Sequence, residues 1–127
     1  MNSPTQRSLK YLRETGWDAE VVERWNSYAR RRVDLFNCID IVALRDGELA
    51  GVQTTSQSGS SRIAKIKDEK LMRAWLRAGG TLYVHGWAKR GPRGKRKVWT
   101  VRVVKITEDM LRAEDHVLHD ANVEGAD

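Results

Sequence analysis

The chain has 127 residues, of which 40% are hydrophobic and 31% charged, and its formal net charge is +6. This length accommodates one hydrophobic core but not two. No apolar run approaches the roughly 18 residues needed to cross a bilayer, and the N-terminal residues lack the apolar segment of a secretory signal. We therefore expect no membrane association and a place in the cytoplasm, that of the host cell if the chain is phage-encoded.

Charge is distributed unevenly along the chain. Residues 108–127 contain seven acidic residues and one arginine, a net charge of −6, so residues 1–107 carry +12. A body this basic attracts polyanions, and neutralising phosphates releases counterions from nucleic acid. We expect a single domain over residues 1–107, followed over 108–127 by a short helix capped by Thr107 and an acidic tail.

The first half of the chain predicts one helix and three strands. Ser3 followed by Pro4 is typical of a helix start, and the apolar spacing predicts a helix over residues 4–15. Polarity alternates with period two over residues 17–25, which predicts the first strand. The apolar segment 33–44 and residues 48–55 predict two more strands.

The second half predicts a helix and a hairpin. Apolar residues recur at helical spacing over residues 62–78, before two glycines. Strands are expected at 81–87 and 98–106, joined by a basic turn over 89–97. The predicted fold class is an α+β sandwich, a mixed sheet of about five strands flanked by helices in the order α-β-β-β-α-β-β-α.

A polar pair is expected beside the predicted turn at Asp46-Gly47. In a two-residue turn at this dipeptide, Asp40 lies opposite Gln53 with their Cβ atoms roughly 5 Å apart, and Thr55 is a diagonal neighbour. An aspartate inside an apolar strand is costly unless it is paired or binds a cation. Two interpretations stay open: a satisfied polar pair, or a Mg²⁺ site in which the Gln53 amide oxygen is a second ligand.

These residues carry a family resemblance. Asp40 in a hydrophobic strand, followed by Gln53-Thr54-Thr55 on the next strand of an α-β-β-β-α-β order, resembles the PD-(D/E)XK nuclease superfamily, and its Holliday-junction-resolvase-like and small phage members in particular. The resemblance implies a restriction-endonuclease-like core, a Mg²⁺ or Mn²⁺ cofactor, cleavage of DNA including branched DNA, and a homodimer. Gln53 and Thr55 stand where the family has Glu and Lys.

The resemblance leaves a carboxylate and a lysine to be supplied from elsewhere. Lys65 or Lys67 of the expected helix 62–78 could supply the cation, the resemblance favouring Lys65 and the helical period Lys67. A further acid could come from Glu23 or Glu20, from Glu14, or from Glu69, which we rank below Glu23. The expected catalytic residues are Asp40, Gln53, Thr55, Lys65, Lys67 and Glu23, with Asp40, Gln53 and Glu23 as metal ligands.

Clustered cations predict contacts to a phosphate backbone. They are Arg30, Arg31, Arg32, Arg62, Lys89, Arg90, Arg93, Lys95, Arg96 and Lys97. Most of the tryptophans are expected in the core, with Trp25 or Trp87 as candidates for stacking on bases. Cys38 lies in an apolar run and is expected to be a buried, inert thiol. The three histidines lack the spacing of a zinc site.

The functional hypothesis is therefore a metal-dependent endonuclease acting on DNA more readily than on RNA. Two alternatives belong to other classes: a nucleic-acid-binding module on the same fold without catalytic activity, and a phage-encoded regulator whose basic face binds an acidic protein.

Overall fold

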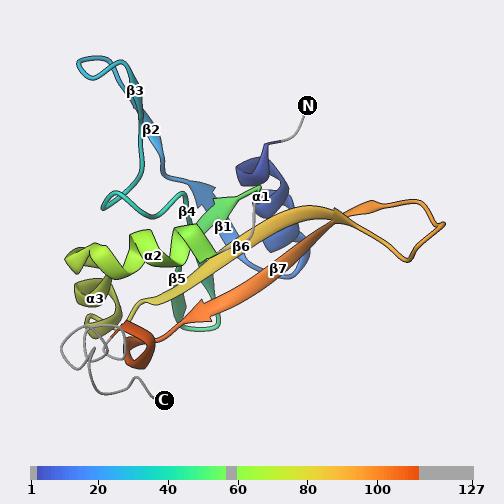
Figure 1. Ribbon diagram of the computed structural model, residues 1–127. Coiled ribbons are helices and arrows are strands. Elements are labelled where there is room, and N and C mark those ends of the chain that lie inside the picture. The colour runs from blue at the N-terminus through green and yellow to red at the C-terminus, as the bar shows by residue number, and fades with distance from the viewer. Residues whose placement is uncertain (1–2, 57–59, 112–127) are drawn as a thin grey trace, which may run out of the picture.

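The computed structural model describes residues 3–56 and 60–111 (Figure 1). Its elements, in chain order, are α1 (Pro4–Glu14), β1 (Asp18–Val21), β2 (Arg24–Asn26), β3 (Arg31–Val33), β4 (Ile41–Arg45), β5 (Glu48–Thr55), α2 (Ser60–Asp68), α3 (Lys70–Arg77), β6 (Thr81–Arg90) and β7 (Val98–Ile106). No helix in these ranges is long and apolar enough to span a membrane.

Five strands form one mixed sheet in the order β1-β4-β5-β6-β7. All neighbouring strands are antiparallel except β5 and β6, which run parallel and are connected through α2 and α3. A parallel pair needs such a crossover because the chain must return to the starting edge of the sheet before the second strand begins, and a tight turn joins only antiparallel strands. The predicted α+β class, with a mixed five-stranded sheet flanked by helices, is confirmed.

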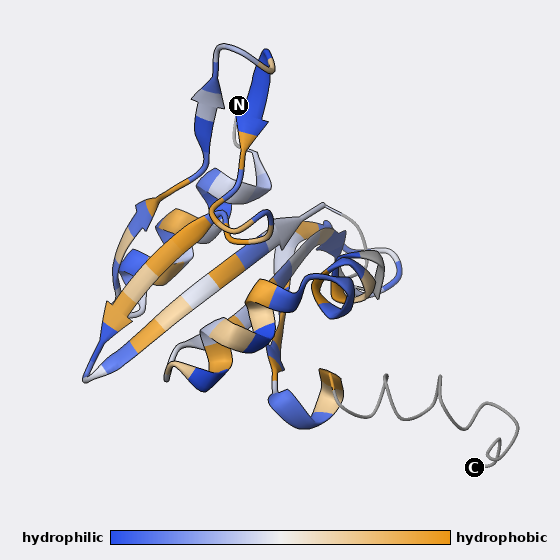
Figure 2. Ribbon diagram, turned by 90° about the vertical axis from the view of Figure 1, so that its left-hand side faces the viewer, coloured by the Kyte–Doolittle hydropathy of each residue, from blue (hydrophilic) through white to orange (hydrophobic). Residues whose placement is uncertain are grey.

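Two hydrophobic clusters lie on opposite faces of the sheet. One packs α1 against β1, β4 and β5 through residues that include Leu12, Ile41 and Val52. The other packs α2 and α3 against β6 and β7 and includes Ile66 and Leu82. Figure 2 shows hydrophobic residues alternating with hydrophilic ones along these strands and helices.

Several local predictions are confirmed. Ser3 caps α1, accepting a hydrogen bond from the backbone N–H of Gln6 at 3.1 Å. Asp46 and Gly47 both have positive φ, 48° and 82°, as the two central residues of a tight hairpin require. This turn sets the expected register between β4 and β5, with Leu44 opposite Leu49.

The predicted first strand, residues 17–25, is wrong in its extent. The chain leaves the main sheet after Val21, and β2 pairs instead with β3 as a separate two-stranded sheet. Arg30, Arg31 and Arg32 therefore belong to a hairpin rather than to a plain loop. The period-two pattern continues through both strands, so polarity alone could not reveal where the chain changes partner.

The predicted second strand, residues 33–44, is also too long. Residues 34–40 form a compact loop in which Phe36 and Asn37 have positive φ, and the Leu35 and Ile39 backbones pair with each other. Regular pairing with β5 starts only at Ile41, opposite Val52. The loop contains apolar residues because Cys38 and Ile39 are fully buried. An apolar sequence is also typical of a buried strand, which is why a strand was predicted here. The buried position expected for Cys38 is confirmed, and burial raises the pKa of its thiol to about 11.

The predicted helix 62–78 is two helices. Glu69 has an extended backbone and caps α3, its carboxylate accepting from the Leu71 N–H at 3.2 Å. An acidic residue at a helix start is favoured by the partial positive charge there. The basic turn is shorter than predicted, because Lys89 and Arg90 continue β6 opposite β7.

The end of the described chain follows the expectation as far as it extends. Thr107 accepts a hydrogen bond from the Met110 N–H at 3.3 Å, and residues 108–111 are helical. The remaining acidic tail, residues 112–127, lies outside the described residues.

Candidate metal centre

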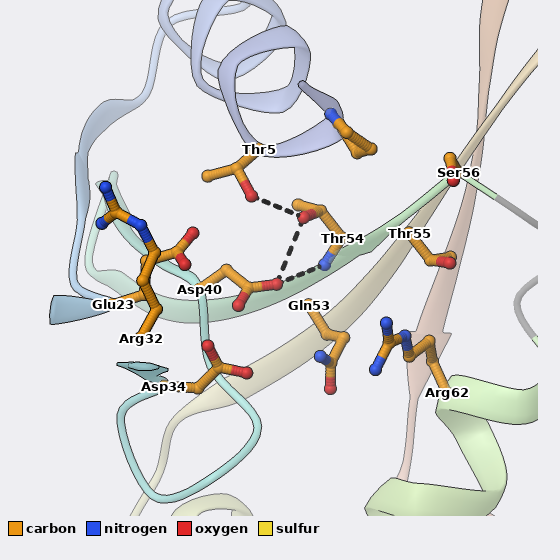
Figure 3. Close-up of a pocket in the computed structure, with 11 residues that line it drawn as sticks. Thr5, Glu23, Arg32, Asp34, Asp40, Gln53, Thr54, Thr55, Ser56 and Arg62 are labelled. Atoms are coloured by element: carbon orange, nitrogen blue, oxygen red, sulfur yellow. Dashed lines mark hydrogen bonds between the residues drawn. The ribbon is translucent and has the colours of Figure 1, made fainter. Parts of the chain in front are cut away.

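A pocket of about 440 Å³ lies at the carboxyl end of β5, between the start of α1 and the start of α2. Thr54 faces α1 from this strand, whereas Gln53 lies on the opposite side, near Arg62 of α2 (Figure 3). The residues that line the pocket are Pro4, Thr5, Glu23, Arg32, Asp34, Asp40, Gln53, Thr54, Thr55, Ser56 and Arg62. Nearly all of them are polar, which suits a charged ligand.

Three carboxylates meet in this pocket. Glu23, Asp34 and Asp40 each place an oxygen within 4.8 Å of the other two. Each lies just outside a strand: Glu23 lies between β1 and β2, Asp34 follows β3, and Asp40 precedes β4. Like charges this close repel one another strongly unless a proton or a cation intervenes.

Asp40 is the most buried of the three, at 6% exposure. Its Oδ2 accepts hydrogen bonds from the Thr54 N–H at 2.8 Å and the Thr54 hydroxyl at 3.2 Å. Thr54 is held in turn by Thr5 of α1, with 2.9 Å between the two Oγ1 atoms. Burial, together with the neighbouring Asp34 and Glu23, raises the pKa of Asp40 to about 7, although the Thr54 N–H acts in the opposite direction.

Gln53 adds a neutral oxygen to the site. The residue is 1% exposed, and its Oε1 atom has no hydrogen-bond partner among the described residues. A buried carbonyl oxygen without a partner costs about 1–3 kcal/mol. Gln53 lines the same pocket as the carboxylates and lies beside Asp34 and Asp40 in Figure 3. Three carboxylates and an amide oxygen are the hard donors that Mg²⁺ and Mn²⁺ prefer, so the residues fit such an ion.

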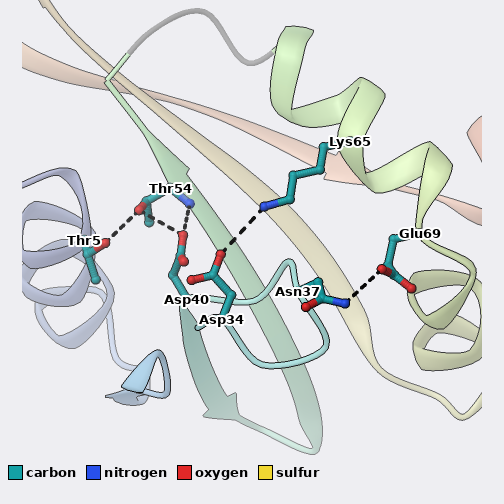
Figure 4. Close-up of polar contacts among 7 residues, drawn as sticks. All are labelled: Thr5, Asp34, Asn37, Asp40, Thr54, Lys65 and Glu69. Atoms are coloured by element: carbon teal, nitrogen blue, oxygen red, sulfur yellow. Dashed lines mark hydrogen bonds and ion pairs between the residues drawn. The ribbon is translucent and has the colours of Figure 1, made fainter. Parts of the chain in front are cut away.

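Cationic side chains border the carboxylates. Lys65 extends from α2 so that its Nζ lies 3.9 Å from Asp34 Oδ2 (Figure 4). Arg32 and Arg62 line the pocket from the β2–β3 hairpin and from α2. Of the two lysines left open by the sequence, Lys65 forms this ion pair with a member of the cluster, and neither lysine is among the residues that line the pocket.

Among the predicted site residues, Asp40, Gln53, Thr55 and Glu23 all line the pocket. The expected direct pairing of Asp40 with Gln53 is wrong, because regular pairing ends at Ile41 and the Asp40 N–H binds the Val52 carbonyl instead. This shift lets the Asp40 carboxylate reach Thr54.

The other candidate acids lie elsewhere. Glu14 pairs with Lys10 on α1, and Glu20 pairs with Arg13 at 3.8 Å. Glu69 caps α3 and accepts from Asn37. None of the three lines the pocket.

Sequence reasoning missed Asp34 and Thr54. Asp34 interrupts the apolar segment as Asp40 does, and that repeated interruption was the available signal. Assigning the whole segment to one strand hid it, because a straight strand would hold residues 34 and 40 roughly 20 Å apart. Thr54 was missed because strand alternation places it on the face opposite Gln53.

The predicted phosphate-binding cations fall on two hairpins and one helix. Arg30, Arg31 and Arg32 lie on the β2–β3 hairpin, Arg62 lies on α2, and Lys89, Arg90, Arg93, Lys95, Arg96 and Lys97 lie on the β6–β7 hairpin. Both hairpins extend beyond the body of the protein (Figure 1).

The two candidate stacking tryptophans differ. Trp25 is 59% exposed. Trp87 is buried and its Nε1 donates to Ser8 at 2.8 Å, so a base-stacking role for Trp87 is wrong.

No protein-family model matches the sequence, and no curated protein matches it.

Proposed function

We propose that this protein is a divalent-metal-dependent nuclease that hydrolyses phosphodiester bonds in DNA. The observation that carries the proposal is the meeting of Glu23, Asp34 and Asp40 within 4.8 Å in an open pocket. A cluster of acids alone would repel a phosphate. With a divalent cation held by these acids, the same pocket becomes attractive to one.

The ion would be held by the three carboxylates, with the Gln53 Oε1 as a neutral donor. Mg²⁺ or Mn²⁺ bound there supplies positive charge for the phosphate oxygens and acidifies bound water. The charge that the resemblance predicts at position 53 is supplied by Asp34 and Glu23 instead, so Gln53 is compatible with metal binding.

The cations at the rim have separate tasks. Arg62 and Arg32 line the pocket and are placed to bind the phosphate on either side of the carboxylates. Lys65 approaches from α2 and takes the part of the lysine that the family resemblance predicts at position 55. Positive charge there stabilises the charge that develops on the phosphate during hydrolysis.

Nucleic acid is favoured as the substrate by the distribution of charge. Residues 1–107 carry +12, and the β6–β7 hairpin places a run of lysines and arginines away from the body. If β2 and β3 are set aside as a separate sheet and α2 and α3 are counted as one crossover, the order of the remaining elements is compatible with the α-β-β-β-α-β order of the PD-(D/E)XK resemblance. Both observations support DNA as the substrate, and the resemblance adds a homodimer to the proposal.

The test is cleavage of labelled duplex, flap, four-way-junction and single-stranded DNA, with matching RNA, in Mg²⁺, Mn²⁺ or EDTA. Asp40→Asn removes a central carboxylate and retains an acceptor for Thr54. Glu20→Gln is the matched control, since Glu20 is an exposed acid outside the pocket. We expect cleavage by the wild type and by Glu20→Gln only with metal, and loss of cleavage in Asp40→Asn.

Binding of DNA without cleavage in any metal would reject the nuclease and leave the binding module. Absence of binding to any nucleic acid at moderate salt would favour the protein-binding regulator.

A further inference from the structure

The β2–β3 hairpin, residues 24–33, contributes no side chain to the hydrophobic core. None of its residues is buried, and it forms a sheet separate from the main one. Two-stranded hairpins in water are marginal on their own, and the exposed side chains of this one are available to a ligand because no core takes them up. Figures 1 and 2 both show the hairpin standing away from the body. We call it the arginine hairpin.

Its composition matches a polyanion that carries aromatic bases. The hairpin holds Arg24, Arg30, Arg31 and Arg32 and no acidic residue. Trp25 is 59% exposed and Tyr28, at the tip, is 99% exposed. The turn that presents Tyr28 is ordered by a hydrogen bond from the Ala29 N–H to the Asn26 side chain at 2.9 Å.

The hairpin is joined directly to the metal centre. Glu23 immediately precedes it and Asp34 immediately follows it, and both are members of the carboxylate cluster. Trp25 lies opposite Arg32 in the β2–β3 register, so the two side chains share one face of the hairpin. Arg32 lines the pocket, and the face that bears Trp25 is therefore continuous with the proposed cleavage site.

We propose that the arginine hairpin binds unpaired nucleotides next to the scissile phosphate, with Trp25 and Tyr28 stacking on bases and the arginines binding the backbone. Exposed aromatic rings recognise bases only where the bases are unstacked, which a continuous duplex does not offer. The position of these nucleotides next to a cleaved phosphate rests on the proposed nuclease function. The inference adds a substrate preference to that function: the preferred substrate has single-stranded character beside the cleavage site, as at a flap or junction.

The first experiment measures binding without chemistry. Fluorescence anisotropy with a labelled single-stranded oligonucleotide and its duplex, in EDTA, compares the wild type with Trp25→Leu and Tyr28→Leu. Each leucine variant should bind the single strand roughly 5- to 150-fold more weakly, the range expected for loss of one stacked base, and bind the duplex as the wild type does. Trp25→Phe and Tyr28→Phe should retain most of the affinity because the ring remains.

Two controls separate stacking from charge and from folding. Leu49→Ala changes an exposed apolar residue outside both the hairpin and the pocket and should leave binding unchanged. Arg31→Ala should lower the slope of log affinity against log salt concentration by about 0.7, whereas the leucine variants should leave that slope unchanged. Thermal unfolding of all hairpin variants should match the wild type, because no residue of the hairpin is buried.

The second experiment measures cleavage of flap and duplex substrates by the same variants in Mg²⁺. The leucine variants should lose the preference for the flap and retain cleavage of the duplex. Unchanged single-strand binding in both leucine variants, or an equal loss for single strand and duplex, overturns the inference even if cleavage remains metal-dependent. Selective loss of single-strand binding without cleavage in any metal supports the hairpin's role and rejects the nuclease. Binding of an acidic protein but of no oligonucleotide overturns both.

Discussion

The carboxylate cluster predicts that removing one of its charges stabilises the metal-free protein. Asp40 is buried beside Asp34 and Glu23, which raises its pKa to about 7 from an ordinary value of 3.8. At about 1.4 kcal/mol per pH unit, ionising Asp40 in the folded state costs up to about 4 kcal/mol of stability at pH 8. Asp40→Asn removes this cost and retains an oxygen to accept from the Thr54 N–H.

The sign of the effect with pH follows from linkage. A carboxyl whose folded pKa is raised binds more protons in the folded than in the unfolded state between about pH 4 and 7, so the contribution of Asp40 to stability falls as pH rises through this window. The advantage of Asp40→Asn should therefore be largest at pH 8 and nearly absent at pH 4. Adding Mg²⁺ at pH 8 should stabilise the wild type, because a ligand that binds only the folded state shifts the unfolding equilibrium, and should stabilise Asp40→Asn much less.

The assay is urea unfolding followed by circular dichroism at pH 4 and pH 8, in EDTA and in Mg²⁺. Glu20→Gln is again the control, since replacing a single exposed charge should change stability by less than about 0.5 kcal/mol. If Asp40→Asn is less stable than the wild type in EDTA at pH 8, the hydrogen bonds to Thr54 outweigh the charge repulsion. The reasoning that links the cluster to a cation would then be refuted.

Three further changes test other parts of the structure. Burial lowers the pKa of His85 to about 4, so the contribution of His85 to stability should fall by up to about 3 kcal/mol as pH drops from about 6.5 to 4, opposite in sign to that of Asp40; with Asp40→Asn as the background, His85→Gln should flatten this part of a urea-unfolding pH profile. Gly80→Ala would place a Cβ 2.5 Å from the Trp75 Nε1, which donates to the Thr81 carbonyl, and should cost about 1–3 kcal/mol in the same unfolding assay. Lys65→Ala should lower the cleavage rate about 100-fold whereas Lys67→Ala should not, and equal rates for the two variants would contradict the role given to Lys65.

Local signals in the sequence predicted most of the main sheet. The Asp46-Gly47 dipeptide set both the turn and the register of β4 with β5, because few other residue pairs adopt positive φ at two successive positions. The limits of β5 and β7 followed from alternation between turn residues. Predictions succeeded where the deciding interaction lies within a few residues along the chain.

The failures arose where a long-range contact decides the conformation. Residues 34–40 look like a strand because they are apolar, yet they are apolar because Cys38 and Ile39 pack under α2 and α3. Glu69 has a high helix propensity, yet it separates α2 from α3. Its carboxylate caps the beginning of α3 and accepts a hydrogen bond from Asn37, and these contacts favour the break. The site was predicted only in part for the same reason. The Asp46-Gly47 turn indicated that Asp40 and Gln53 lie near each other, whereas the position of Asp34 depends on how the loop over residues 34–40 folds, which the sequence does not reveal.

The loop between Asp34 and Asp40 explains how the protein holds like charges together. Its two left-handed residues, Phe36 and Asn37, reverse the chain so that both aspartates face one pocket. Burial of Ile39 contributes about 1.5–3 kcal/mol, which is comparable with the cost of the charged cluster. The apolar part of the loop thus stabilises an arrangement of carboxylates that would separate in a freely mobile loop. The loop therefore holds two carboxylates in the pocket that Gln53 also lines, and this is the arrangement on which the proposed cation site depends.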